Sequence, residues 1–179
     1  MIKKLTFIPH IKYLKDKCNK ALQLIRVIAH TDWGADKQTL LRLYRSLVRS
    51  KLDYGCFIYG SARQSYIKSL DTIHHQGLRL VLGAFRTSPA ESLYSEANEA
   101  PLALRRQKLA MQYFIKISSC PNNPAYDCIA NPLYKPLFDR KENDIKPFGL
   151  RIGNVLSETS INLDHIHESS FLKTLSWNR

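Results

Sequence analysis

Five aspartates in the first half of the sequence are the side chains best suited to holding catalytic metal ions. They are Asp16, Asp32, Asp36, Asp53 and Asp71. Two-metal phosphoryl transfer needs carboxylates clustered so that the two ions lie about 4 Å apart. These aspartates are isolated from one another along the chain, and no Asp-Asp pair occurs. We therefore expect no polymerase or nuclease centre in this chain.

Other patterns that bind metals or phosphates are weak. His74 and His75 are adjacent, so on a helix their side chains diverge by about 100° and cannot chelate one ion together. His165 and His167 have no further ligand at zinc-site spacing. The sequence has no G-x-x-x-x-G-K-[ST] loop, no G-x-G-x-x-G loop and no G-x-S-x-G elbow. We expect neither a bound metal nor a cofactor.

Positive charge is the most informative property of the sequence. The chain of 179 residues has 27 Lys and Arg against 15 Asp and Glu, a formal net charge of +12. All of this excess lies before Cys120, because the 7 basic and 7 acidic residues from Cys120 onward cancel. A basic surface of this kind favours a polyanion, above all nucleic acid, as the partner.

Hydrophobic spacing predicts the elements that would position these charges. Apolar residues recur every three or four positions, which predicts amphipathic helices over 11–29, 37–52, 65–82, 88–98 and 101–119. Asp36 is expected to cap the second helix and Gly83 to end the third. Ser88 and Glu91 are expected to form a capping box around Pro89. Residues 53–60 are compatible with either a helix extension or a short strand.

Basic residues lie opposite the apolar stripes of three of these helices. Such rows can grip a phosphate backbone with salt-sensitive, sequence-independent affinity, although on a single helix they are more often ordinary solvated faces. The residues expected to contact nucleic acid are Lys12, Lys15, Arg42, Arg45, Arg49, Lys68 and Arg79. Five aromatic residues, Trp33, Tyr44, Tyr54, Tyr59 and Phe85, could stack on bases, but their apolar neighbours favour core packing.

The sequence after Ser119 has a different character. Five prolines interrupt residues 120–179, and no apolar periodicity persists there. We expect a mainly α protein: a basic bundle of four to five amphipathic helices over 1–119, followed by a Pro-rich, partly ordered extension over 120–179 with a short element near 149–152. No apolar run is long enough to cross a membrane, and the four cysteines are expected to be free thiols in an intracellular protein.

Several blocks of the sequence resemble the region that follows the polymerase palm in reverse transcriptases of non-LTR retrotransposons, particularly the jockey-like group. The blocks are KLTFIPHI (4–11), TDWGAD (31–36), LYRSLVRSKLDYG (43–55), GLRLVLGAFRTSP (77–89) and PLALRR (101–106). Their order and spacing are similar to the family from about Lys4 to at least Tyr126, and PFGLR (147–151) is similar too.

The resemblance implies that this region is the thumb and connection of such an enzyme. The thumb holds the template–primer duplex by its backbone, as RNA–DNA or DNA duplex. In the family the catalytic palm precedes this region, and in many members a ribonuclease H domain follows it. The resemblance therefore implies that the palm and the ribonuclease H domain are partners of this region. It also implies a location in the nucleus and cytoplasm. The chain begins after the palm, so we expect the isolated protein not to polymerise. The alternatives are a helical scaffold that docks onto palm or nuclease domains, and a relic that folds poorly.

Overall fold

The computed structural model describes residues 7–30, 33–130, 136, 138 and 146–158. Within this part the protein is mainly α-helical without a strand, as the hydrophobic spacing predicts. Compact packing divides the chain into two units, Met1–Arg106 and Gln107–Arg179. The change in composition after Ser119 thus lies further along the chain than the division between the units. Helix α7, Leu102–Ser118, contains that division.

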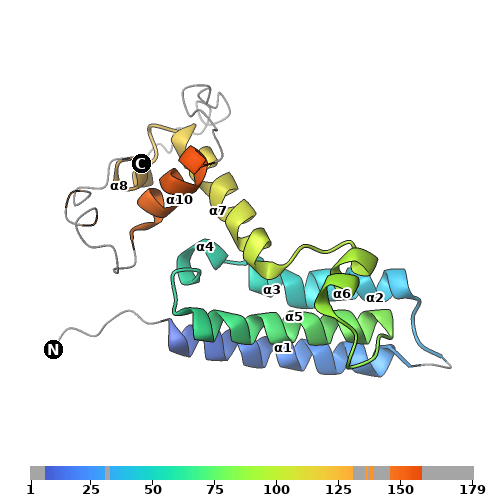
Figure 1. Ribbon diagram of the computed structural model, residues 1–179. Helices are drawn as coiled ribbons and strands as arrows, with labels where there is room; N and C mark the ends of the chain where they lie inside the picture. The colour runs from blue at the N-terminus through green and yellow to red at the C-terminus, as the bar shows by residue number, and fades with distance from the viewer. Residues whose placement is uncertain (1–6, 31–32, 131–135, 137, 139–145, 159–179) are drawn as a thin grey trace, which may run out of the picture. The chain divides into compact units, whose positions relative to one another are not determined.

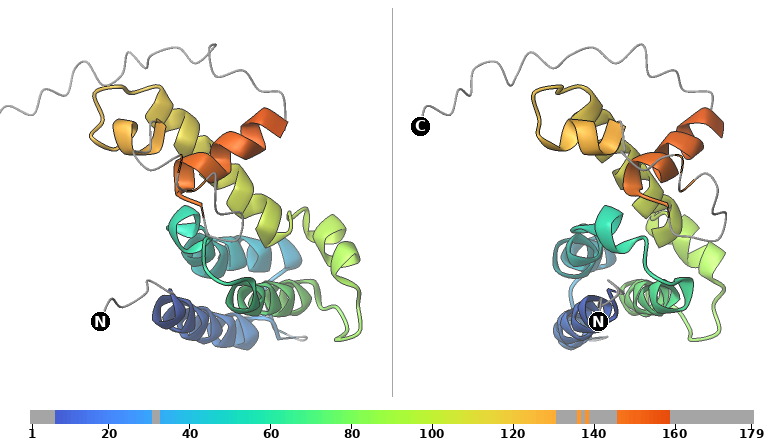
Figure 2. Two further views of the ribbon diagram at one scale, coloured as in Figure 1. Left: turned by 60° about the vertical axis from the view of Figure 1, so that its left-hand side comes forward. Right: turned by 90° about the vertical axis from the view of Figure 1, so that its left-hand side faces the viewer.

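The first unit is built on a bundle of three helical segments that pack against one another (Figures 1 and 2). Helix α1, Ile8–Ile28, packs chiefly on α5, Gln64–Leu82. The two run side by side in the same direction, and the helical segment between them in sequence returns in the opposite direction (Figures 1 and 2). That segment is α2 (Lys37–Tyr44), a π-helical turn (Arg45–Arg49) and α3 (Ser50–Asp53). Helix α6, Ala90–Ala97, packs on α5.

The predicted apolar stripe of α1 forms its buried side. Ile11, Leu14, Cys18, Ala21, Leu22 and Ile25 are all buried. Ile28, which was expected to continue the stripe, is 36% exposed because the helix ends there and leaves the bundle. The helix also begins earlier than expected, at Ile8, because Pro9 lies in the first turn, where a missing backbone N–H costs nothing.

The second helical segment has the predicted start and a feature that the sequence did not indicate. Asp36 Oδ2 accepts hydrogen bonds from the backbone N–H groups of Gln38 and Thr39, at 3.0 and 3.2 Å. The π-helical turn then widens the helix, so that residues four apart stay on one side. Tyr44, Val48 and Leu52 are consequently all buried.

Asp53 is the last residue of α3, and residues 54–60 form neither a strand nor an unbroken continuation of that helix. Gly55 takes a left-handed conformation with φ 66° and ends α3, because glycine has no Cβ to resist it. The one-turn helix α4, Cys56–Tyr59, follows, and its Tyr59 hydroxyl donates a hydrogen bond back to the carbonyl oxygen of Leu52. Tyr54, between α3 and Gly55, is left pointing outward and is 83% exposed.

Helix α5 matches its predicted inner side. Ile67, Leu70, Ile73, His74, Leu78 and Val81 are buried. Gly83 caps the helix with φ 65°, as predicted. Gly77 allows a close approach, since a Cβ added there would lie 2.5 Å from a ring carbon of Tyr44 and 3.2 Å from a methyl carbon of Leu22. Helices α1, α2 and α5 therefore meet at this glycine.

The predicted capping box before α6 does not form. Helix α6 begins at Ala90 with the extended Pro89 as its N-cap, and no side chain caps it. The carbonyl oxygen of Ser88 instead accepts a hydrogen bond from Arg79. Because the proline ring already fixes the backbone of Pro89 in an extended conformation, the helix starts after it.

The second unit contains most of α7, helix α8 (Ala125–Ala130) and helix α10 (Phe148–Glu158). Tyr113 and Phe148 pack edge to face, with ring centroids 5.8 Å apart. A methyl group at Gly149 would overlap the backbone of Ile129, so this glycine allows α10 to pack directly on α8. The short element expected near 149–152 is the first part of α10.

Candidate nucleic-acid interface

Four of the seven predicted cations lie on the pair of parallel helices α1 and α5. Lys12 and Lys15 are exposed on α1, Lys68 is exposed on α5, and Arg79 is half-buried near the end of α5. The structure therefore brings together residues from two of the three predicted rows, because the helices that carry them are direct neighbours.

The cations of α1 and of α5 are separated by the same number of residues. Arg26 follows Lys15 by eleven residues, and Arg79 follows Lys68 by the same interval. Eleven residues are about three turns, or roughly 16 Å along the axis, so each pair faces almost one direction. Arg26 and Arg79 line one hollow at the C-terminal ends of α1 and α5. Because the helices run in the same direction, Lys15 and Lys68 are expected at similar heights.

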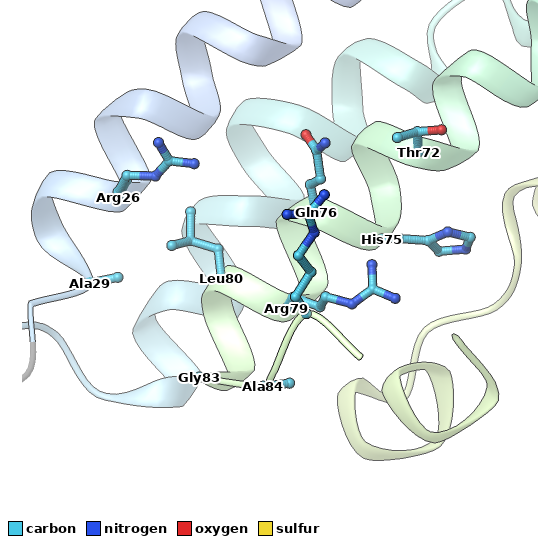
Figure 3. Close-up of a pocket in the computed structure, with 10 residues that line it drawn as sticks. Arg26, Ala29, Thr72, His75, Gln76, Arg79, Leu80, Gly83 and Ala84 are labelled. Atoms are coloured by element: carbon cyan, nitrogen blue, oxygen red, sulfur yellow. The ribbon is translucent and has the colours of Figure 1, made fainter. Parts of the chain in front are cut away.

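This hollow is an open groove of about 810 Å³ (Figure 3). Three arginines line it: Arg26 from α1, Arg79 from α5 and Arg86 from the connection after α5. His75, Gln76 and Thr72 supply further polar groups, and the residues that line the groove include no acidic side chain. A groove with three guanidinium groups and no carboxylate is suited to a phosphate-bearing ligand.

Arg79 is held in place by the connection that follows its helix. Its Nη2 donates a hydrogen bond to the carbonyl oxygen of Ser88 at 2.9 Å. Its Nε is buried without a hydrogen-bond partner among the described residues. Arg26 and Arg79 lie in the last turns of their helices, whose C-terminal ends each carry about half a negative charge. The three guanidinium charges exceed these two partial charges, while the carboxylates of Asp71 and Glu91 act on His75 from outside the lining of the groove.

The pKa of His75 depends on the charges around the groove. Its Nε2 lies 2.5 Å from the hydroxyl oxygen of Tyr94. Partial burial and, next, the positive charge of Arg79 lower the pKa of His75 below its usual value. An anion bound in the groove would offset the second of these causes and raise this pKa.

The other three predicted cations lie elsewhere. Arg45 Nε contacts Glu99 Oε1 at 2.6 Å, and Arg49 Nη1 contacts the same oxygen at 2.5 Å. Glu99 is only 5% exposed, so this carboxylate is a buried counterion for both arginines. We therefore leave Arg45 and Arg49 out of the candidate interface. Arg42 is exposed on α2, whose buried side faces α1 and α5, so it lies on another side of the bundle.

Arg26 and Arg86 are not among the residues predicted to contact nucleic acid. Helical spacing does place Arg26 on the same polar side of the first helix as Lys12 and Lys15. Arg86 lies between helices, where periodicity gives no information. Only the fold brings it beside Arg79.

The aromatic residues considered for base stacking divide into two groups. Tyr44 and Tyr59 are core residues, 0% and 2% exposed. Trp33, Tyr54 and Phe85 are 65%, 83% and 83% exposed, against the expectation of core packing. The exposed rings follow helix ends, where the chain turns away from the bundle.

Three of the five aspartates considered above have structural roles, and Asp16 is exposed on α1. Asp36 caps α2, Asp53 pairs with Arg105 at 2.8 Å, and Asp71 lies 3.5 Å from Arg106. Asp32, His165 and His167 lie outside the described residues. Among the described residues, no group of three or more His, Cys, Asp or Glu side chains could hold a metal ion.

Cys18, Cys56, Cys120 and Cys128 are all free thiols, and the first three are buried. Burial raises the pKa of Cys18 and of Cys56 to about 11, so neither is a thiolate nucleophile at neutral pH. No helix in the described part of the chain is long and apolar enough to cross a membrane.

Comparisons of the chain with protein-family models, with curated proteins and with solved structures give no match.

Proposed function

We propose that this chain is a thumb-like part of a non-LTR retrotransposon reverse transcriptase that grips a template–primer duplex by its phosphate backbone and has no catalytic centre of its own. The observation that carries the proposal is the electropositive face of α1 and α5. Two parallel rows of cations there end in one three-arginine groove. The sequence resemblance supplies the family and the kind of nucleic acid.

Backbone binding suits this face for a physical reason. Lysines on two neighbouring helices present charge at intervals along both helix axes, an arrangement that suits repeated phosphates along a strand. Each phosphate neutralised releases condensed counterions, so affinity depends on salt and hardly on sequence. The parent enzyme's palm and ribonuclease H domains are the proposed protein partners, and the nucleus and cytoplasm are the proposed locations.

The test is a fluorescence anisotropy titration of the full chain with a labelled blunt RNA–DNA hybrid at several salt concentrations. The double variant Lys15→Gln/Lys68→Gln removes one charge from each row. We expect its plot of log affinity against log salt to be shallower than that of the wild type by about two units, because each lost phosphate contact lowers the slope by about one.

A matched control removes the same charge from the other flank of α1, with one lysine on α1 and one on the neighbouring α3. Lys17→Gln/Lys51→Gln changes two lysines that line a different groove and should leave the slope for the blunt hybrid within about one unit of the wild type. Equal slopes for the two double variants would reject the α1/α5 face as the interface. Primer extension by the purified chain would contradict the absence of a catalytic centre.

One observation favours a second candidate function, a helical scaffold that docks onto other domains. Leu24 and Val27 are 62% and 64% exposed and are neighbours three residues apart on α1. Exposed apolar side chains that lie together are typical of protein interfaces. If the folded chain does not bind the hybrid even at low salt, this scaffold function replaces the thumb-like one.

A further inference from the structure

A second groove lies on the other flank of α1, between its first half and the end of α3. Its volume is about 410 Å³, within the range of roughly 300–1,000 Å³ found for small-ligand sites. The lining residues are His10, Tyr13, Leu14, Lys17, Ser50, Lys51 and Tyr54. Its walls are mainly apolar, and none of these residues is acidic.

Two exposed tyrosines give this groove its aromatic surface. Tyr13 is 58% exposed on α1, and Tyr54 is 83% exposed at the end of α3. Tyr54 points outward because Gly55 reverses the chain immediately after it. Leu14 is buried and forms part of the apolar wall. Planar aromatic surface exposed in a groove is suited to a planar ligand, since stacking requires an accessible ring face.

Two lysines bring positive charge to the same groove. The Lys17 ammonium lies 5.4 Å from the centroid of the Tyr13 ring, a cation–π contact that holds it at the groove instead of in open solvent. Lys51, half-buried on α3, lies on the opposite wall. A ligand that satisfies both features has a flat apolar part and an attached negative charge.

We propose that this groove binds an unpaired nucleotide of a single-stranded nucleic acid, with the base against Tyr54 and Tyr13 and its phosphate near Lys17 and Lys51. A base in a duplex is already stacked and cannot enter, so the ligand is a single strand. Base–aromatic stacking tolerates any base, because every base has a π-face.

This site is independent of the proposed grip on duplex. Lys17 and Arg26 are nine residues apart, about two and a half turns, so they project from opposite sides of α1. A duplex lying along α1 and α5 would leave the groove uncovered. Loss of one activity therefore does not require loss of the other.

The experiment compares two labelled single strands of equal length and charge, a thymidine oligomer and the same oligomer with abasic sites. We expect the full chain to bind the thymidine oligomer at least about five-fold more tightly, because stacking of one base contributes at least about a factor of five. Tyr54→Leu should abolish this preference, because leucine keeps apolar area but has no ring. Tyr54→Phe should retain it.

Other outcomes would overturn the proposal. Equal affinity for the two oligomers means that the lysines bind phosphate without a base. A glutamate-rich peptide of the same charge with one phenylalanine serves as a competitor. If it binds more tightly than the thymidine oligomer and loses affinity in Tyr54→Leu, the groove is a protein-docking site. The blunt hybrid is titrated alongside, and an unchanged affinity in Tyr54→Leu shows that the duplex face is intact.

Discussion

At the scale of single residues, Glu99 determines which arginines are available for binding. Its carboxylate, with a side chain only 2% exposed, contacts both Arg45 and Arg49. Removing one partner of a buried ion pair is costly, since it leaves the other charge desolvated and uncompensated. The same two arginines would have been the obvious choice for mutating a phosphate-binding row, but their loss would destabilise the bundle.

We therefore expect Glu99→Gln to lower the free energy of unfolding by about 3 kcal/mol. Glu96→Gln is the matched control, because Glu96 pairs with Lys37 at 2.7 Å but its side chain is 56% exposed. Exposed pairs contribute at most about 1 kcal/mol, so this variant should remain close to the wild type. Urea denaturation measures the free energy of unfolding of both variants. Similar decreases in the two would show that the burial of Glu99 does not set the strength of its ion pairs.

His74 gives the bundle a dependence on pH. It is 1% exposed, and its Nδ1 is hydrogen-bonded to the Tyr44 hydroxyl. Burial, followed by the charge of His75, lowers the pKa of His74 from 6.5 to about 4. Between these values the unfolded chain binds a proton that the folded chain excludes. Stability is thus complete above pH 6.5 and declines as the pH falls toward 4.

We expect the free energy of unfolding to fall by on the order of 2 kcal/mol between about pH 7 and pH 5. His74→Asn keeps a hydrogen-bonding group for Tyr44 but cannot titrate, so its stability should depend much less on pH. His75 contributes in the same direction, since its pKa is also lowered. Urea denaturation at several pH values measures the slope, and an unchanged slope in the variant would assign the effect to other groups.

At the scale of elements, Gly77 determines how closely α5 approaches α1 and α2. An added Cβ would meet the Tyr44 ring at 2.5 Å, too close for any real contact. Tyr44 is 0% exposed and cannot move aside without disturbing its bond to His74. Gly77 therefore matters through packing rather than through backbone freedom.

Gly77→Ala should lower the free energy of unfolding by about 1–3 kcal/mol, the usual cost of overpacking a core. The control is Gly153→Ala in α10, where an added Cβ meets nothing within 4 Å. That variant should be neutral or gain up to about 1 kcal/mol from better helix propensity. Thermal unfolding followed by circular dichroism compares them, and a stable Gly77→Ala protein would mean that these helices can separate without cost.

The π-helical turn is the element that the sequence did not reveal. Ser46 and Ser50 direct their hydroxyls to the backbone carbonyls of Leu43 and Ser46, a competition that weakens regular helical bonding. The wider turn keeps Val48 and Leu52 in line with Tyr44 on the buried side. Regular α-helical spacing predicts Tyr44 and Val48 on the buried side, as observed, but it does not indicate the wider turn itself.

At the scale of the whole molecule, the direction of the helices creates the candidate interface. Two helices that run in the same direction bring equal sequence intervals to equal heights, so Lys15 with Arg26 and Lys68 with Arg79 form matched rows. The excess of positive charge in the first part of the chain is a property of composition. The gathering of three arginines in one groove depends on the packing of α1 against α5 and on the path of the connection that carries Arg86.

The sequence by itself determined the helices and most of their buried sides. It also determined the cap at Asp36 and the end at Gly83, because spacing and capping depend on neighbours three or four residues away. The prediction was wrong at Ile28, which is partly exposed because the helix ends there. It was also wrong at Ser88, because Pro89 takes the N-cap position. Only the folded chain pairs Glu99 with Arg45 and Arg49. It also brings Arg26, Arg79 and Arg86 to one groove. These contacts join residues far apart in the chain, and no local pattern records which distant charges folding will bring together.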